Sequence, residues 1–344
     1  MFNLGDIVLE GTILSDLPGR RVQITGTTTA TTTLGGPVTG TGGGELRLDG
    51  GWTNLAGNTI SMTDGVLGLW GDWINDGTIL ATNSTVSFGN TLNDNWVNNN
   101  TITLVNSPAD VGGSFDLALL SGISTDSPLN IGGNFDNTGT DFNLDLFPPG
   151  VTLDSGGTII GGTISGAGSF SVNATNAHLD GVTLATDLII DNGGRVDILN
   201  GLTMSGGDIF LESANSFTDL RFEGSQTLGG TGNVHYAGTA TVDDRNRIYL
   251  SAAGQVLTIG SGITIETDTT GGRLGITNLG DIVFEGTVLS DLPGRRVQIT
   301  GTDTATTTLD GVVTGTGGGE LRLDGGWTNL AGNTISMTDG VLGL

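Results

Sequence analysis

The sequence contains a long internal copy of itself. The stretch from Asn3 to Leu69 recurs as Asn278 to Leu344, with five differences in 67 positions. Such a copy, offset by about 275 residues, indicates that the chain is built from tandem units. We predict one complete unit over residues 1–277 and the start of the next over residues 278–344, in one continuous stack without a separate globular domain. The five differences are Leu9 to Phe284, Ile13 to Val288, Thr28 to Asp303, Gly35 to Asp310 and Pro37 to Val312.

A chain that stops inside a copy is expected to be a segment of a longer array, so the lack of a signal peptide tells nothing about export. The first two differences keep apolar character at alternating positions, as buried strand positions require. The other three change freely and are expected at turns or on the outer face.

A shorter period lies inside the unit. The pattern Trp-x-Asn followed by Thr-Ile begins at Trp52, Trp73 and Trp96, and a looser version begins at Phe135. The first three starts are spaced by about 21 and about 23 residues, which is the length of one solenoid coil. Between these marks lie short segments of alternating apolar and polar residues that end in Gly, Asn or Asp, which is typical of strands. No helical periodicity is sustained over three turns.

Short strands at this spacing predict coils rather than hairpins. We predict an all-β fold, a right-handed parallel β-helix (β-solenoid) of about 20–21 residues per coil, in which each strand pairs with its equivalent one coil away. A unit of about 275 residues would then make 13 or 14 coils and measure on the order of 65 Å. The many turns with positive φ explain the 62 glycines.

The same period predicts ladders inside the coils. Trp52, Trp73, Trp96 and Trp327 are expected to form an internal aromatic stack or a shielded turn. Asn54, Asn75 and Asn98 follow two positions after each Trp and are expected to hydrogen-bond from coil to coil. A sugar-stacking surface is the alternative for the Trp residues, Trp327 included, and Trp70, which lies outside the register, is the better candidate for exposure.

Charge and composition exclude several classes of function. The chain has 36 acidic and 11 basic residues, a net charge of −25, no Cys, and only Arg among its Lys and Arg residues. Nucleic acid and anionic membranes are therefore not expected as partners. Disulfides, thiol nucleophiles and lysine Schiff bases are excluded, and no apolar run approaches the roughly 20 residues of a membrane helix.

Several segments resemble the coils of the giant secreted bacterial repeat proteins that carry autotransporter-like or filamentous-haemagglutinin-like parallel β-helices. The resemblance covers essentially the whole chain and implies an exported protein at the cell surface or outside the cell. It transfers no catalytic residue. The segments are GGTISGAGSFSV from Gly161, LDGVTL from Leu179, NGLTMSGGDIFL from Asn200, LRFEGSQTLGGTGNVHYAG from Leu220, VLTIGSGITI from Val256, and the Trp-x-Asn coils.

A pectate-lyase-type enzyme is the sharpest alternative, because those β-helices bind Ca²⁺ through Asp clusters and use a basic residue to abstract a proton. The nearest constellation is TVDDRNRIYL, with Asp243, Asp244, Arg245 and Arg247. Acidic residues beside Arg more commonly belong to a solvated turn with local ion pairs than to a catalytic site. Tandem copying also favours length and multivalency over catalysis.

The remaining candidates have structural explanations. His178 and His235 lie far apart in the sequence and are expected at unrelated positions. The Thr-rich run from Thr25 to Thr33 occurs once per unit and is expected in a polar loop or outer strand. Known calcium-binding repeat motifs are absent from the sequence. Loose binding of Ca²⁺ by the acidic surface is left open, and we assign no catalytic, cofactor-binding or metal-ligating residue.

The sequence therefore predicts a structural protein and not an enzyme. We expect a scaffold or adhesin stalk of an extracellular or cell-surface filament, continued by its own copies and contacting surface glycans or neighbouring fibres. The alternative is a β-helix that binds or cleaves polysaccharide.

Overall fold

The structure is a computed structural model that describes residues 5–27, 29–147, 150–168, 170–275, 279–302 and 304–344. It is an all-β fold with 55% strand and 2% helix, in which parallel strands stack into a β-solenoid of about 14 turns. The predicted fold class is confirmed, and its handedness stays a prediction. Among the described residues, no helix is long and apolar enough to cross a membrane.

The residues group into two compact units. Unit 1 comprises Met1–Asn137 and Leu144–Thr152, and unit 2 comprises Thr138–Asn143 and Leu153–Leu344. This division does not follow the sequence copies, because the end of the first copy and the start of the second both lie in unit 2. The predicted boundary at residues 277 and 278 itself lies outside the described residues, and the continuity of the whole stack stays a prediction.

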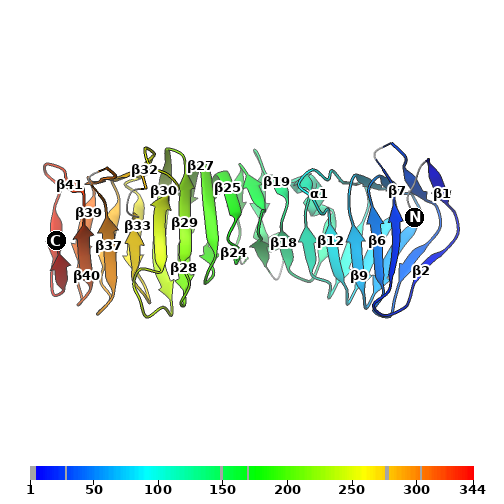
Figure 1. Ribbon diagram of the computed structural model, residues 1–344, viewed down its shortest axis with the longest axis horizontal. Coiled ribbons are helices and arrows are strands. Elements are labelled where there is room, and N and C mark those ends of the chain that lie inside the picture. The colour runs from blue at the N-terminus through cyan, green and yellow to red at the C-terminus, as the bar shows by residue number, and fades with distance from the viewer. Residues whose placement is uncertain (1–4, 28, 148–149, 169, 276–278, 303) are drawn as a thin grey trace. The chain divides into compact units, whose positions relative to one another are not determined.

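Unit 1 is built from three stacks of parallel strands (Figure 1). The first stack is β1 (Ile7–Leu9), β4 (Thr32–Leu34), β7 (Trp52–Asn54), β10 (Trp73–Asn75) and β13 (Val97–Asn98). The second is β2 (Ile13–Ser15), β5 (Val38–Gly40), β8 (Thr59–Thr63), β11 (Thr78–Thr82), β14 (Ile102–Val105) and β17 (Ile123–Thr125). The third is β3 (Arg21–Thr25), β6 (Glu45–Asp49), β9 (Val66–Leu69), β12 (Thr85–Phe88), β15 (Ala109–Val111) and β18 (Leu129–Ile131).

Unit 1 also contains β16 (Ser114–Asp116), β19 (Asn134–Asp136), the helix α1 (Leu117–Ser121) and the 3₁₀ helix η1 (Leu144–Leu146). Strand β21 (Val151–Leu153) crosses the unit boundary. The sequence did not predict α1, which is too short to show a helical period. Asp116 caps it by accepting a hydrogen bond from the Leu119 N–H at 2.9 Å.

Unit 2 repeats the same plan. One stack is β20 (Asp141–Asn143), β23 (Thr163–Ser165), β25 (Ala177–Leu184), β27 (Arg195–Ser205), β30 (Gln226–Gly238), β32 (Val256–Ile259), β35 (Asp281–Phe284), β38 (Thr307–Leu309) and β41 (Trp327–Asn329). A second runs from β22 (Thr158–Ile160) through β25 and β27 to β29 (Thr218–Glu223), β31 (Asn246–Leu250), β34 (Gly272–Leu274), β37 (Arg296–Thr300), β40 (Glu320–Asp324) and β43 (Val341–Gly343).

The third stack of unit 2 is β24 (Phe170–Val172), β26 (Leu188–Ile190), β28 (Ile209–Ser213), β30, β33 (Ile263–Thr267), β36 (Thr287–Ser290), β39 (Val312–Gly315) and β42 (Ile335–Met337). The long strands β25, β27 and β30 each contribute to two stacks. In every stack alternate apolar side chains point inward and form the core.

The predicted aromatic column lies inside unit 1. Trp52, Trp73 and Trp96 are at most 2% exposed and stack with ring centroids 4.9 and 5.2 Å apart. Phe115 and Phe135 continue the column at 5.7 and 5.3 Å. The stacked, buried rings confirm the internal column rather than a sugar-binding surface.

The predicted asparagine ladder is also present. The side-chain amide of Asn54 donates to the Asn75 carbonyl at 2.7 Å, and that of Asn75 donates to Asn98 at 2.7 Å. Asn54 and Asn75 are fully buried. The ladder satisfies polar groups that would otherwise be orphaned in the core.

Coil length is less regular than the sequence predicts. Phe170 pairs with Leu188, whereas Gln226 pairs with Leu257, so the offset between partners grows from about 18 to about 31 residues. Loops such as residues 239–245 absorb most of the extra length, and a register shift between Asp180 and Val182 in the pairing of β25 with β27 adds to it. Loop length costs little free energy, so the coils of unit 2 are unequal and one sequence unit makes fewer coils than predicted.

The second copy begins inside unit 2 without a break in the stacking. Strands β35, β36 and β37 of the second copy pair in parallel with β32, β33 and β34 of the first. Phe284 and Val288 are fully buried, as predicted from their apolar character. The variable positions Gly35, Pro37, Asp310 and Val312 are exposed, as expected. The difference at Thr28 and Asp303 lies outside the described residues.

Candidate functional site

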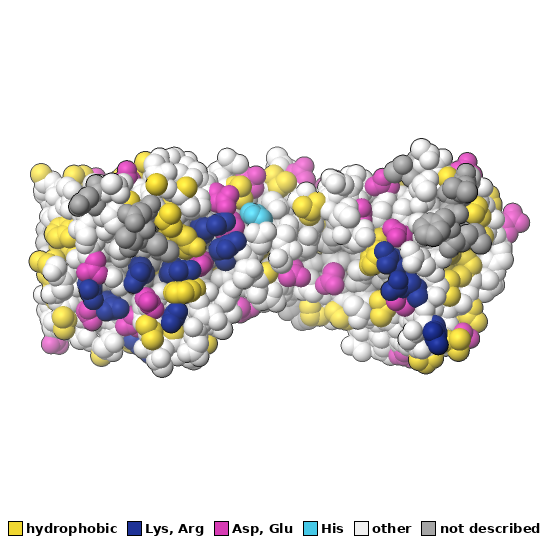
Figure 2. Space-filling view, in the orientation of Figure 1, with side chains coloured by type: hydrophobic (Ala, Val, Ile, Leu, Met, Phe, Trp, Pro, Cys, Tyr) yellow, Lys and Arg dark blue, Asp and Glu magenta, His cyan; other side chains and the backbone are white. Residues whose placement is uncertain are grey.

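Arginine is unevenly distributed over the fold. Eight of the 11 basic residues lie in unit 2, on or beside successive strands of its second stack. We call the outward surface that carries them the arginine face. Figure 2 shows the dark blue basic side chains gathered there among magenta acidic ones, in the left part of the view. The eight residues are Arg195, Arg221, Arg245, Arg247, Arg273, Arg295, Arg296 and Arg322.

The strand pleat puts these side chains on one surface. In β29, Leu220 and Phe222 are fully buried, and the residues between and beside them point outward. Parallel pairing then aligns the outward residues of successive coils, roughly 4.8 Å apart. The first row contains Arg195, Asp219, Arg247, Arg273, Gln298 and Arg322. The second row contains Thr158, His178, Asp197, Arg221 and Tyr249.

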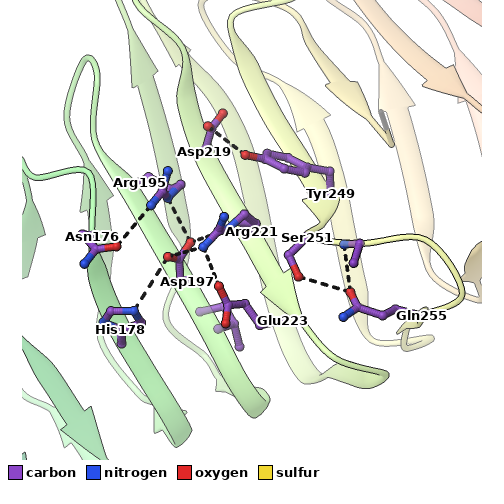
Figure 3. Close-up of polar contacts among 12 residues, drawn as sticks. Asn176, His178, Arg195, Asp197, Asp219, Arg221, Glu223, Tyr249, Ser251 and Gln255 are labelled. Carbon is purple, nitrogen blue, oxygen red and sulfur yellow. Dashed lines mark hydrogen bonds and ion pairs between the residues drawn. The ribbon is translucent and has the colours of Figure 1, made fainter. Parts of the chain in front are cut away.

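Asp197 holds one end of the face together (Figure 3). Its carboxylate is fully buried and accepts a hydrogen bond from Arg195 at 3.0 Å and two from Arg221 at 2.6 Å each. His178 lies 3.8 Å away, beyond hydrogen-bond distance. Bidentate pairing of this kind fixes the orientation of the Arg221 guanidinium.

Asp219 has the same role on the next coil. It accepts two hydrogen bonds from Arg247 at 2.6 and 2.7 Å, and one from the Tyr249 hydroxyl at 3.1 Å. Burial, together with the negative charge of Asp219, raises the pKa of Tyr249 to about 12. Tyr249 therefore stays protonated at neutral pH and serves as a hydrogen-bond donor.

Arg221 is held in its charged form. Burial alone lowers its pKa, but the hydrogen bond and charge of Asp197 and the charge of Glu223 raise the pKa of Arg221 above its ordinary value. A guanidinium of this kind binds anions and does not abstract protons.

The structure brings the enzyme candidates of the sequence onto this face but separates them into different ion pairs. Asp243 accepts from the Gly271 N–H at 3.1 Å and from Arg295 at 3.2 Å. Asp244 lies 3.6 Å from Arg245 and 4.0 Å from Arg273.

Arg247 turns to Asp219 rather than to the adjacent acids, and its guanidinium packs on the Phe217 ring with 3.7 Å to the centroid. Arg295 belongs to the second copy, so the loop at Asp243 joins one copy to the next. It is an ion-paired loop, as the structural interpretation of this constellation predicts.

The two histidines lie in different rows. His178 is on β25 in the second row of the arginine face, whereas His235 is on β30 and pairs with Phe210 and Glu266 in the third stack. The His235 ring stacks on Phe210 at 4.5 Å, and its Nδ1 lies 3.0 Å from the Glu266 carboxylate. The expectation that the two positions are unrelated is confirmed.

Trp70 and Trp327 are both half-buried. Arg47 covers the Trp70 ring at 3.4 Å from the centroid, and the indole N–H of Trp70 donates to Ser87 at 2.8 Å. Trp70 is therefore more accessible than the stacked Trp residues of the column, but Arg47 shields one of its faces.

The Thr-rich run forms the turn between β3 and β4. The Thr27 N–H donates to the Ala30 carbonyl at 2.8 Å, and Thr32 and Thr33 pair as members of β4. Thr28 lies outside the described residues. The run is a polar turn followed by a short strand, as expected.

Unit 1 has a shallow groove of about 300 Å³ that Asp49, Asp72 and Asp94 line from three successive coils. Asp94 is 8% exposed and accepts hydrogen bonds from the Gly71 and Asn90 N–H groups and the Thr91 hydroxyl. Burial alone raises the pKa of Asp94, but these hydrogen bonds together lower it. Within the described ranges, no three His, Asp or Glu side chains form a group that would hold a metal ion.

No protein family model, curated protein sequence or solved structure matches this chain. The resemblance to bacterial surface β-helices therefore stays a prediction beyond the solenoid fold itself.

Sequence reasoning did not find the arginine face. The signal was present in the segments RVDIL, LRFE, RIYL, GRL and RVQIT, where Arg precedes or lies between apolar residues. Arg195, Arg221, Arg247 and Arg273 recur every 26 residues, which is longer than the predicted coil of about 20–21 residues, so the predicted period does not align them.

Proposed function

We propose that this chain builds a structural scaffold from tandem β-solenoid units, as the stalk of an extracellular or cell-surface filament. The observation that carries the proposal is the passage from the first copy to the second inside unit 2. All three stacks continue across it with parallel pairing. A unit that receives its own copy this way is suited to extension.

The same residues in the two copies show what stacking contributes. Val22 and Ile24 in β3 are half-buried, because β3 pairs only with β6 in the described structure. Their equivalents Val297 and Ile299 in β37 are fully buried, because β37 pairs on both sides. The extra coil removes apolar surface from water, which favours continued stacking.

We further propose that the protein is exported and is not an enzyme. The ion pair between Asp243 and Arg295 and the raised pKa of Arg221 support a non-catalytic role, because a paired acid and a fully charged guanidinium are poor acid–base catalysts. Polysaccharide cleavage is the alternative. Depolymerisation of a glycan that disappears on changing Asp243 and Asp244 would establish it.

Electron microscopy of proteins with one, two and three units tests the scaffold. In the third stacks, five pairings join Val22 to Leu129 and seven join Phe170 to Ile335, which gives about 21–24 residues per turn. Each added unit of about 275 residues therefore supplies about 12 turns and roughly 55–60 Å, at about 4.8 Å per turn. Particles should lengthen by this amount at constant width. Particles that grow in all dimensions, or as separate globules, would refute the scaffold.

A further inference from the structure

Six of the eight arginines of the arginine face divide into two kinds. Arg195, Arg221 and Arg247 make charge-assisted hydrogen bonds of 2.6–3.0 Å to carboxylates that are at most 8% exposed. The guanidinium groups of these three residues are held by carboxylates of the protein itself.

Three other arginines are paired only loosely. Arg245 lies 3.6 Å from Asp244, Arg273 lies 4.0 Å from Asp244, and Arg296 lies 3.7 Å from Glu320. The Nε–H groups of Arg273 and Arg296 are buried and have no acceptor in the described structure. The closest contact of the three is a long hydrogen bond from Arg273 to the Gln298 carbonyl at 3.4 Å.

The three loosely paired arginines lie around one glycine on three successive coils. The register that joins Asn246 to Gly272 and Gly272 to Val297 places Arg245 and Arg296 on either side of Gly271. Arg273 lies two positions after Gly271 and so points to the same surface. The side chain of Asp243 packs against Gly271 and accepts its N–H at 3.1 Å. We call Arg245, Arg273 and Arg296 the open cluster.

We propose that the open cluster binds the carboxylates of an acidic polysaccharide that lies along the arginine face. A guanidinium fork matches a carboxylate in geometry and charge. Each coil presents a further cation roughly 4.8 Å along the stack, which suits a polymer with regularly spaced charges. The inference goes beyond the scaffold role and does not depend on it.

Neighbouring groups favour a sugar acid over other polyanions. Asp243 and Asp244 lie within the cluster, and their side chains are 14% and 31% exposed. Exposed carboxylates accept hydrogen bonds from sugar hydroxyls, whereas the phosphates of a nucleic acid would be repelled by these two carboxylates and by the net charge of −25. Phe217, which is 42% exposed, packs beneath Arg245 at 4.6 Å and holds that guanidinium at the surface.

The open cluster forms where two copies meet. Arg245 and Arg273 belong to the first copy, whereas Arg296 is the second-copy equivalent of Arg21. Arg21 is 48% exposed and pairs with Glu45 at 2.7 Å on the first described coil. One site is therefore expected per junction, and an array with many junctions gains avidity.

Calorimetric titration of the full chain with a defined-length oligogalacturonate tests the proposal. We expect one site per chain, and binding at least about tenfold weaker in Arg273→Gln, Arg296→Gln and Arg245→Gln, as loss of a charge-assisted hydrogen bond implies. Arg273→Lys, which keeps the charge but loses the fork, should also weaken binding. Arg21→Gln is the matched control and should bind like the unmodified chain.

The methyl-esterified oligomer keeps the sugar rings and loses their charges, and it should not bind. The proposal is overturned if the charged and esterified oligomers bind alike, if neither binds, or if Arg21→Gln weakens binding as much as Arg296→Gln. Binding of single-stranded oligothymidylate as tight as that of the uronate would also overturn it. Circular dichroism and thermal melting of each variant show whether the fold is kept. Arg245 lies in the loop before β31, so Arg245→Gln is the variant expected to disturb the core least.

Discussion

Asp197 is the residue on which one half of the arginine face depends. Its carboxylate is fully buried and serves two arginines at once. Removing one member of a buried ion pair leaves the other charges uncompensated, which costs far more than loss of a surface pair.

We predict that Asp197→Asn lowers the free energy of unfolding of unit 2 by about 3–5 kcal/mol. Glu223, which also pairs with Arg221 but is 37% exposed, provides the control, because Glu223→Gln removes a solvent-screened pair worth about 0–1 kcal/mol. Urea denaturation of both variants measures the difference. Equal losses would show that burial of the Asp197 pair is unimportant.

Asp94 predicts a pH dependence of stability. Because the folded protein lowers the pKa of this carboxyl, the ionised form stabilises the fold above the unfolded-state pKa, near 4. That contribution is lost as the pH falls through the lowered folded-state pKa. Asp94→Asn should therefore be less stable than the unmodified chain at pH 7 and match it more closely at pH 2, as measured by thermal melting. A difference that does not change with pH would contradict this assignment.

At the scale of single elements, the copies provide strands of identical sequence in different surroundings. The segment RVQIT forms β3 in the first copy and β37 in the second. Only β37 has a neighbouring strand on both sides in the described structure. Strand stability in a solenoid should depend on its neighbours rather than on its own sequence.

We predict that backbone amides of β3 exchange with solvent more than about tenfold faster than the same amides of β37. The opposite order is expected for the segment WTN, which is buried in β7 and largely exposed in β41. Hydrogen exchange followed by mass spectrometry resolves all four segments. Equal protection of the paired segments would mean that local sequence, and not stacking, sets their stability.

Elements also show what the sequence reveals and what it hides. The Trp and Asn ladders follow from equal spacing in the pattern around Trp52, Trp73 and Trp96, where coils keep nearly constant length. The first row of the arginine face does not, because its partners lie about 24–28 residues apart, farther than the predicted coil of about 20–21 residues. Pairing in a solenoid fixes strands and leaves loops free, so unequal loops conceal which polar residues share a surface.

At the scale of the whole molecule, the chain is acidic, and its basic residues are concentrated in unit 2. A net charge of −25 keeps such a protein soluble, yet most of its arginines lie on one face of unit 2. The net charge is a sum over the whole chain, so it does not exclude a polyanionic partner for a local basic surface. The Debye length of about 8 Å at physiological salt allows a local cluster to act on its own.

The passage from one copy to the next also has a consequence for inheritance. Because every junction between copies is built from the same sequence, recombination between copies removes or inserts one whole repeat and leaves every remaining strand with a neighbour of the same kind. The number of copies is then free to change between generations without any new contact having to be selected. Such a gene can adjust the reach of its product in a single genetic event.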